Sequence, residues 1–246
     1  MDIKYSEKKT LKTYQTDMYG FMRPMMVMNE LQALADTHAE KLGVGRTWCL
    51  ENNVAWVVTH YLLDMPYLPR EGDEIELETW PVSHDNLKAV RDFNVRDKDG
   101  NVIISATSQW ILIDMETRRP VRIGDYLPKT WGENSVRALD LPFAKLPDFT
   151  PTEEDVLFAV RYDDIDVNKH VNNAVYIIWA TESVGLDYRE VHELRKLFVN
   201  FRKEIPAAPM NLQVEIAKTG LITRNKVKSG DTEFARVYCE WKKRYE

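Results

Sequence analysis

Three side chains that can move protons or orient a carbonyl group stand at alternate positions: Asp166, Asn168 and His170. In an extended segment, residues two apart point to the same side, so the spacing predicts that all three share one side. The next residues are apolar at helical spacing, at Val175, Ile178, Trp179 and Leu186. A polar triplet before a helix N-terminus, whose free N–H groups attract a carbonyl oxygen or an oxyanion, suits acyl chemistry. From the spacing alone, a helix-capping loop with a structural histidine fits equally well.

Composition and charge are those of a soluble globular protein with no affinity for nucleic acid or membrane. The chain has 246 residues, of which 44% are hydrophobic and 29% are charged, and no apolar run is long enough to cross a bilayer. Its 33 basic and 39 acidic residues give a net charge of −6, which disfavours general nucleic-acid binding. Neither end has the pattern of a targeting segment, so we expect a cytoplasmic protein.

The metal-binding and thiol residues predict neither a metal site nor a cofactor. Cys49 and Cys239 lie far apart in the sequence and are typical of free, packed thiols in a reducing compartment. The five histidines form no HxxxH motif and no Cys/His cluster, so a zinc site is not expected.

The first half of the chain predicts one amphipathic helix followed by antiparallel strands. Pro24 suits the first turn of the helix, and Gly43 ends it. The predicted apolar face contains Met28, Leu31, Ala35, His38 and Leu42. His38 is therefore expected to be a core histidine. Alternating segments predict strands at 54–63, 74–80, 89–95 and 102–114.

The second half repeats this order of elements after a proline-rich linker at 125–155. Its helix is predicted at 171–186 and its strands at 157–162, 194–205, 211–219, 221–228 and 233–243. A helix buries its apolar face when a curved antiparallel sheet wraps around it. The chain is therefore predicted to be α+β, a tandem duplication with units at 1–124 and 156–246. Two long central helices would be wrapped by antiparallel strands that form one continuous sheet.

A longer pattern surrounds the polar triplet and resembles a known family. Asp166-x-Asn-x-His-Val-Asn-Asn-x-x-Tyr-x-x-Trp-x-x-Glu182 is similar to the signature of the acyl-acyl-carrier-protein thioesterases of plants and their bacterial relatives. Weaker matches occur at Ala55-Trp-Val-Val-Thr59, Gly72-Asp73 with Thr79-Trp80, Arg91-Asp92, Glu116-Thr-Arg-Arg119 and Phe201-Arg-Lys-Glu204.

The resemblance implies a double hotdog fold, which agrees with the duplication. It also implies hydrolysis of fatty acyl-acyl carrier protein to free fatty acid, which ends fatty acid elongation. The partner would be an acyl carrier protein that bears an acyl-phosphopantetheine group. Many plant members have a cysteine after the glutamate of the last motif, whereas this chain has Ile205. The chemistry must therefore work without a cysteine there.

The resemblance supports four catalytic residues and two substrate contacts, namely Asp166, Asn168, His170 and Glu204, and Asn172 and Asn173. Thioester hydrolysis needs an activated water, a polarised carbonyl and a stabilised oxyanion. We assign Glu204 as the general base, while Asn168 and helix N–H groups polarise the carbonyl. His170 would orient the water or share its proton, and Asp166 would fix Asn168 or His170. Without the resemblance, Glu204 resembles a solvated strand residue that alternates with other polar side chains.

The first unit is expected to hold the acyl chain. Methionines cluster at the start of its helix, and flexible thioethers adapt to an alkyl tail. Met25 and Met28 are the candidates, with ordinary core packing as the alternative. Glu182, on the apolar stripe of the second helix, needs a partner, and a structural hydrogen bond or a basic side chain is favoured over catalysis.

An acidic carrier protein requires a basic docking surface. The candidate docking residues are Arg118, Arg119, Arg122, Arg195 and Lys196. Three other functions stay open: acyl-CoA hydrolysis, dehydration of hydroxyacyl chains by a His–Glu pair, and non-enzymatic sensing of an acyl thioester. A tandem hotdog buries the interface that single hotdogs use to dimerise, so both a monomer and a homodimer are compatible with the sequence.

Overall fold

The computed structural model of the chain describes residues 4–127 and 136–244. Pro128 and the linker residues 129–135 lie outside the described residues. The chain divides into two compact units, Met1–Phe143 and Ala144–Glu246, so the division falls within the predicted linker. No helix in the described ranges is long and apolar enough to span a membrane.

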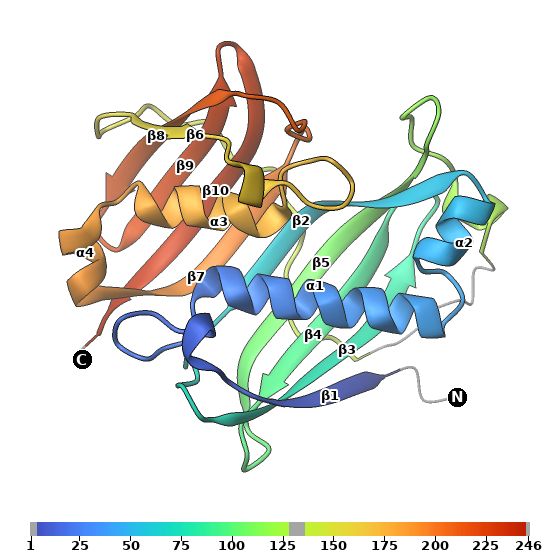
Figure 1. Cartoon of the computed structure of the whole chain (residues 1–246), viewed down its shortest axis with the longest axis horizontal. Helices are drawn as coiled ribbons and strands as arrows, with labels where there is room; N and C mark the ends of the chain where they lie inside the picture. Colours follow the sequence, from blue (N-terminus) through green and yellow to red (C-terminus); the bar gives the residue numbers. More distant parts are fainter. Residues whose placement is uncertain (1–3, 128–135, 245–246) are drawn as a thin grey trace. The chain divides into compact units, whose positions relative to one another are not determined.

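Unit 1 is an antiparallel sheet with a long helix across it (Figure 1). Its strands hydrogen-bond in the order β1, β3, β4, β5, β2. The strands are β1 (Tyr5–Thr10), β2 (Val54–Asp64), β3 (Glu74–His84), β4 (Ala89–Arg96) and β5 (Val102–Asp114). The helices are α1 (Pro24–Lys41), α2 (Arg46–Glu51) and the short 3-10 helices η1 (Thr13–Gln15) and η2 (Ile123–Asp125). The strands predicted for this half are confirmed, whereas α2 was not predicted.

The sequence of α1 explains both its limits and its burial. Pro24 occupies the first turn. Backbone N–H groups in the first turn have no acceptor within the helix, so the missing N–H of proline costs no hydrogen bond there. Gly43 follows the helix with a φ of 72°, a left-handed conformation that a residue without a Cβ adopts easily. The buried side chains of α1 are Val27, Met28, Leu31, Leu34, Ala35 and His38. The predicted helix and its apolar face are therefore confirmed, and His38 is a core histidine.

Unit 2 repeats the strand order of unit 1, with β6, β8, β9, β10 and β7 in turn. Its strands are β6 (Val156–Ala159), β7 (His192–Phe201), β8 (Asn211–Thr219), β9 (Ile222–Ser229) and β10 (Thr232–Lys243). Its helices are α3 (Asn173–Glu182), α4 (Leu186–Val191) and the short η3 (Tyr162–Asp164). The helix α3 packs on β9 and β10 and buries Val175, Tyr176 and Trp179 (Figure 1). The predicted repeat in the order of elements is present in the structure.

The single helix predicted at 171–186 is wrong in length. Gly185, with a φ of 84°, separates α3 from α4 because a left-handed residue cannot continue a helix. Leu186, predicted on the apolar face, is 66% exposed. Glu182 is also exposed, and it pairs with Arg189. The predicted basic partner of Glu182 is therefore present, whereas the predicted burial of Glu182 is wrong.

The described part of the linker is attached to each unit by polar contacts. In unit 1, the fully buried Asp92 carboxylate accepts the Nε–H of Arg137 at 2.9 Å and the Ala138 N–H at 2.7 Å. A buried carboxylate needs such partners, because an unpaired charge in the core is costly. Residues 136–143 are therefore part of the structure of unit 1.

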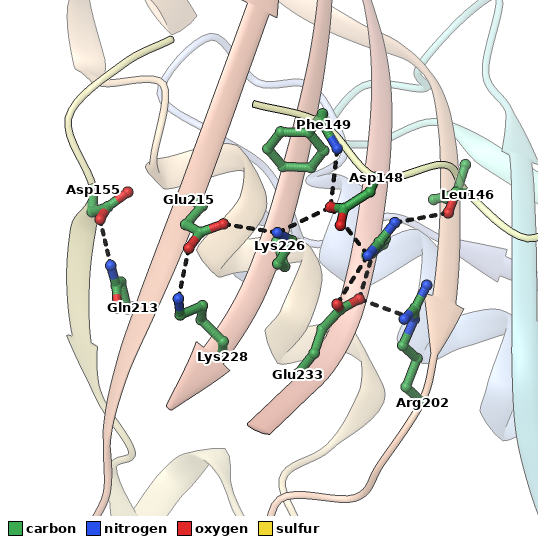
Figure 2. A network of polar contacts seen from close by, with 11 residues as sticks. Leu146, Asp148, Phe149, Asp155, Arg202, Gln213, Glu215, Lys226, Lys228 and Glu233 are labelled. Atoms are coloured by element: carbon green, nitrogen blue, oxygen red, sulfur yellow. Dashed lines mark hydrogen bonds and ion pairs between the residues drawn. The ribbon is translucent and has the colours of Figure 1, made fainter. Parts of the chain in front are cut away.

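In unit 2, the linker crosses one face of the sheet (Figure 2). Asp148 forms ion pairs with Lys226 on β9 at 3.1 Å and with Arg236 on β10 at 3.2 Å. The Leu146 carbonyl accepts a hydrogen bond from Arg236 at 3.1 Å, and the Thr152 N–H donates to β8 at 2.8 Å. Asp148 is exposed, whereas Lys226 and Arg236 are largely buried, so these pairs and the backbone hydrogen bonds together attach the segment to the sheet.

His38 predicts an acid sensitivity of the fold. Burial, with the nearby charges of Arg91 and Lys41, lowers its pKa from 6.5 to about 4. Between these values the unfolded chain binds a proton that the folded chain does not, so stability falls as the pH falls, by at most about 1.4 kcal/mol per pH unit. We expect His38→Gln, which keeps an acceptor for Arg91, to flatten the decline of Tm between pH 6.5 and 4.

His60 has its pKa lowered in the same direction by burial, so part of the decline should persist in that variant. The matched control is His84→Gln, at the end of β3 and outside the core. An equal decline of Tm in the His38 and His84 variants would show that His38 does not cause the effect.

Candidate active site

The extended backbone predicted through Asp166, Asn168 and His170 is wrong, because the segment is a tight turn. The Lys169 N–H donates to the Asp166 carbonyl at 3.0 Å, and the Asp166 N–H donates to the His170 carbonyl at 2.8 Å. The Asp166 carboxylate accepts the Asn168 N–H at 2.8 Å, as aspartates do in turns. Lys169 has a left-handed φ of 61°, and Asn168 is exposed. Asp166 therefore builds the turn that presents His170.

This turn pairs with a segment that follows β7. The Val171 N–H donates to the Ile205 carbonyl at 2.9 Å, and His170 lies opposite Pro206 in a short antiparallel bridge. In this register His170 and Glu204 occupy the same face, since side chains alternate along each segment. The Nε2 atom of His170 lies 3.6 Å from Oε2 of Glu204, with 29% and 38% of the two side chains exposed. The pairing thus joins two candidates that are far apart in sequence.

Glu204 lies beyond β7 and not inside the strand predicted at 194–205. The strand ends because the N–H groups of Arg202 and Lys203 both donate to the Phe234 carbonyl, at 2.8 and 3.2 Å. One carbonyl facing two successive N–H groups breaks the regular ladder and bends the chain. Glu204 therefore stands half-buried where the chain leaves the sheet, and not on the polar face of a strand.

Tyr176 on α3 lies against this bend, and the sequence analysis gave it no role. The residue is 2% exposed and packs in one core cluster with Ile205. Burial, together with the nearby charge of Glu204, raises the pKa of Tyr176 above its usual value, so the hydroxyl is neutral at pH 7. The tyrosine belongs to the signature around His170, and that pattern was the available signal.

The two asparagines predicted to contact substrate lie at the start of α3. Asn172 is the N-cap: its side chain accepts the Ala174 N–H at 2.8 Å, and its carbonyl accepts the Val175 N–H at 3.0 Å. Asn173 is the first helical residue and is half-buried. The cap accepts the N–H groups of Ala174 and Val175 but not that of Asn173. The Asn173 N–H could therefore polarise a carbonyl oxygen.

Unit 1 contains the same loop without the reactive side chains. The Asp17 carboxylate accepts the Tyr19 and Phe21 N–H groups at 2.9 and 3.1 Å, and Gly20 takes the left-handed place of the turn. The Met22 N–H donates to the Pro69 carbonyl at 2.9 Å, as Val171 does to Ile205.

The two loops therefore correspond residue by residue. His170 and Glu204 correspond to Phe21 and Leu68, whereas Asp166 corresponds to another aspartate, Asp17. An aspartate that builds the same turn in a loop without histidine or glutamate is structural there. Of the two loops, only that of unit 2 has a histidine beside a glutamate, and the catalytic role of this unit stays a prediction of the sequence.

The cysteines do not supply a nucleophile. Cys49 and Cys239 are both buried, and burial raises the pKa of their thiols to about 11 and about 12. A thiol is a nucleophile as the thiolate, so neither is reactive near neutral pH. Ile205, which follows Glu204, is fully buried and has no nucleophilic group. No three His, Cys, Asp or Glu side chains gather to hold a metal ion within residues 4–127 and 136–244.

Unit 1 contains a partly open cavity of about 60 Å³. Its lining is mainly apolar and comes from α1, β2, β3, β4 and β5. Lining residues include Ala35, Ala39, Trp56, Ala89, Arg91 and Trp110. Neither Met25, which is half-buried, nor Met28, which is fully buried, lines the cavity. The sequence analysis missed these lining residues because five separate elements contribute to the lining.

The predicted docking residues differ in exposure. Arg118, Arg119 and Arg122 are exposed, the first two in the turn after β5. Arg195 is half-buried, and burial lowers the pKa of its guanidinium. Lys196 lies 3.5 Å from Glu240. The three residues of unit 1 are therefore the more accessible cations.

Comparison with known proteins places the chain in a family. The family model of the acyl-ACP thioesterase N-terminal domain matches residues 2–130, and that of the acyl-ACP thioesterase C-terminal domain matches residues 150–243. Together these two matches cover most of the chain. The chain belongs to the acyl-ACP thioesterase family.

Relatives support this assignment. An oleoyl-acyl carrier protein thioesterase of Arabidopsis thaliana is 27% identical over 82% of this chain and 60% of its own length. A palmitoyl-acyl carrier protein thioesterase of the same plant is 31% identical over 84% of this chain and 53% of its own length. Both are chloroplastic, and the chain thus spans little more than half the length of these relatives.

Solved structures share the fold. A crystal structure of an acyl-ACP thioesterase from Bacteroides thetaiotaomicron matches with a TM-score of 0.86 and 22% identity, covering 98% of each chain. The 12:0-ACP thioesterase from Umbellularia californica matches with a TM-score of 0.84 and 24% identity, covering 99% of each chain.

The capping role of Asn172 can be separated from substrate contact. Asn172→Ala should lower the free energy of unfolding by about 1 kcal/mol, because the cap hydrogen bond is lost. Asn172→Ser, which keeps a capping oxygen, should recover most of this loss. Thermal or denaturant unfolding of the two variants measures the difference. A Ser variant as unstable as the Ala variant would contradict the capping role.

Proposed function

We propose that the chain hydrolyses the thioester of fatty acyl-acyl carrier protein and releases free fatty acid. The observation that carries this proposal is the approach of His170 to Glu204, 3.6 Å apart in the unit that matches the family's C-terminal domain. A histidine and a carboxylate on one partly exposed surface can together activate a water molecule. The named activities of the relatives, acyl-carrier-protein thioesterases, support the substrate class.

In the proposed reaction, a water oxygen bonds to the thioester carbonyl carbon while Glu204 accepts a proton from that water. His170 orients the water or shares this proton. The Asn173 N–H and the side chain of Asn168 stabilise the tetrahedral oxyanion, a contribution of about 10²–10³ in rate for each well-placed donor. Collapse of the oxyanion breaks the C–S bond. The pantetheine thiolate takes up the proton, and the fatty acid leaves.

The finer features of the fold belong to this proposal. The equal strand orders of the two units support a tandem double hotdog, in which the two sheets would be continuous. The acidic carrier protein would dock on exposed cations, of which Arg118, Arg119 and Arg122 are the accessible candidates. Cytoplasmic location and the choice between monomer and homodimer stay predictions of the sequence.

Replacing Glu204 tests the proposed function. Glu204→Gln keeps the size of the side chain but cannot accept the proton, so we expect kcat to fall about 10²-fold or more. Release of free thiol should be followed with carrier-protein and CoA thioesters of varied chain length. Glu190→Gln, on the exposed surface of α4, is the matched control.

Three outcomes would overturn parts of the proposal. Near-normal turnover by a folded Glu204→Gln variant would remove Glu204 as the base. Turnover of CoA esters alone would keep the reaction and replace the partner. Binding without hydrolysis by the wild type would favour the sensor or the dehydratase, and the dehydratase would then act on hydroxyacyl substrates.

The cavity of unit 1 is our candidate for the acyl-chain site. Ala39 lines it from α1, so Ala39→Phe should fill it and shift the preferred substrate toward shorter acyl chains. Ala33→Phe, on the exposed side of the same helix, is the control and should leave the preference unchanged. The measurement is kcat/KM across a chain-length series. An unchanged profile in a stable Ala39→Phe protein would exclude the cavity as the chain site.

A further inference from the structure

The loop that connects α1 to α2, residues 42–45, forms one wall of the unit 1 cavity. Val44, in this loop, lines the cavity and is 4% exposed. Its N–H donates to the Ala39 carbonyl of α1 at 3.0 Å, and its carbonyl accepts the Nε1–H of Trp56 on β2 at 3.1 Å. Ala39 and Trp56 line the cavity as well. Both backbone polar groups of Val44 are therefore bonded to other parts of the cavity wall.

A glycine places this loop directly against α1. A Cβ atom at Gly45 would lie 2.6 Å from the backbone N and 2.7 Å from the Cα of Glu40, a separation that side chains do not tolerate from backbone atoms. Only glycine fits this contact. The N–H of Thr47, in the first turn of α2, donates to the Glu40 carboxylate at 2.9 Å. The loop is therefore attached to α1 on both sides of its closest approach.

Behind the loop lies packed core. Val44 belongs to a cluster of buried side chains that also contains Val54, Ala89 and Leu112. Because core atoms are close-packed, the wall cannot yield to a longer ligand without strain. Asp36, which also lines the cavity, is exposed, so solvent reaches the cavity on that side. The cavity is therefore open toward Asp36 and closed at Val44.

The size of the cavity makes its closed end decisive. About 10–15 Å³ of such space is needed for one water molecule, so about 60 Å³ takes on the order of five groups of methylene size. Alanines at positions 35, 39 and 89 leave this space because their side chains are the smallest in the lining. A methyl group added to the wall or removed from it is thus a large part of the available space.

We propose that Val44 ends the acyl-chain cavity and thereby limits the length of the acyl chain that the enzyme accepts. The inference rests on the proposed function, in which this cavity holds the acyl chain. The last carbons of the chain would pack against the Val44 side chain. A longer chain would have to displace backbone that hydrogen bonds to α1 and β2 hold in place. Val44 takes no part in breaking the thioester bond and determines specificity only.

The test is a pair of substitutions that move the wall in opposite directions. Val44→Ala removes both γ-methyl groups, and the fixed backbone fills the space only in part, so the preferred chain should lengthen by about two carbons. Val44→Ile adds a methylene group and should shorten the preferred chain. The measurement is kcat/KM across a series of saturated acyl-carrier-protein substrates. In Val44→Ala, the chain about two carbons beyond the wild-type optimum should gain about tenfold in kcat/KM relative to that optimum.

The matched control is Val54→Ala. Val54 is fully buried in the same core cluster but does not line the cavity. The control should lower Tm, as Val44→Ala does, and leave the chain-length profile unchanged. A shift of the same size in Val54→Ala would show that loosening of the core, and not the position of Val44, changes the preference.

A second readout needs no turnover. Dissociation constants of free fatty acids of the same lengths should be measured by calorimetry for the wild type and both Val44 variants. Unchanged length dependence in folded Val44 variants would overturn the inference even if the wild type hydrolyses the thioesters. If the wild type hydrolyses none, the proposed function fails, and opposite shifts of fatty-acid affinity in the two variants would still support Val44. A wild type that neither hydrolyses thioesters nor binds fatty acids would contradict both.

Discussion

The short antiparallel pairing of residues 169–171 with 205–207 is the constraint on which the site depends. Two backbone hydrogen bonds, from the Val171 N–H to the Ile205 carbonyl and from the Ala207 N–H to the Lys169 carbonyl, fix the register that sets His170 beside Glu204. A shift of one residue would turn either side chain to the opposite face. The helix cap at Asn172, the turn at Asp166 and the end of β7 all serve to hold these two segments in register.

The two units show that this framework does not depend on the chemistry it supports. Both have an aspartate-built turn, a left-handed residue in that turn, a helix that starts just after it and the same backbone pairing. Only unit 2 places a histidine and a glutamate side by side on the framework, where unit 1 has Phe21 and Leu68. A duplicated scaffold with one reactive copy is consistent with function residing in side chains grafted onto a common fold.

Periodicity alone predicted most of the secondary structure. The face of α1 from Met28 to His38 and the strict alternation in β3 are local patterns, and local patterns specify which face is buried. The same reasoning failed where one residue overrides a pattern. Gly185 separates α3 from α4 although the apolar spacing continues to Leu186, and Asp166 folds an alternating segment into a turn.

The site was predictable only in part, for a physical reason. His170 was a candidate from its spacing, whereas Glu204 came from the family resemblance, because nothing in the local sequence brings together residues so far apart. Their contact arises from long-range pairing, and the end of β7 depends on the distant Phe234 carbonyl.

The most direct test of the account is a double-mutant cycle on the pair. The kcat/KM values of His170→Ala, Glu204→Gln and the double variant should be compared with wild type. If the two groups act on one water molecule, the kcat/KM of the double variant will be only slightly lower than that of the less active single variant. Losses that multiply in full would show that His170 and Glu204 act independently, and would contradict the account.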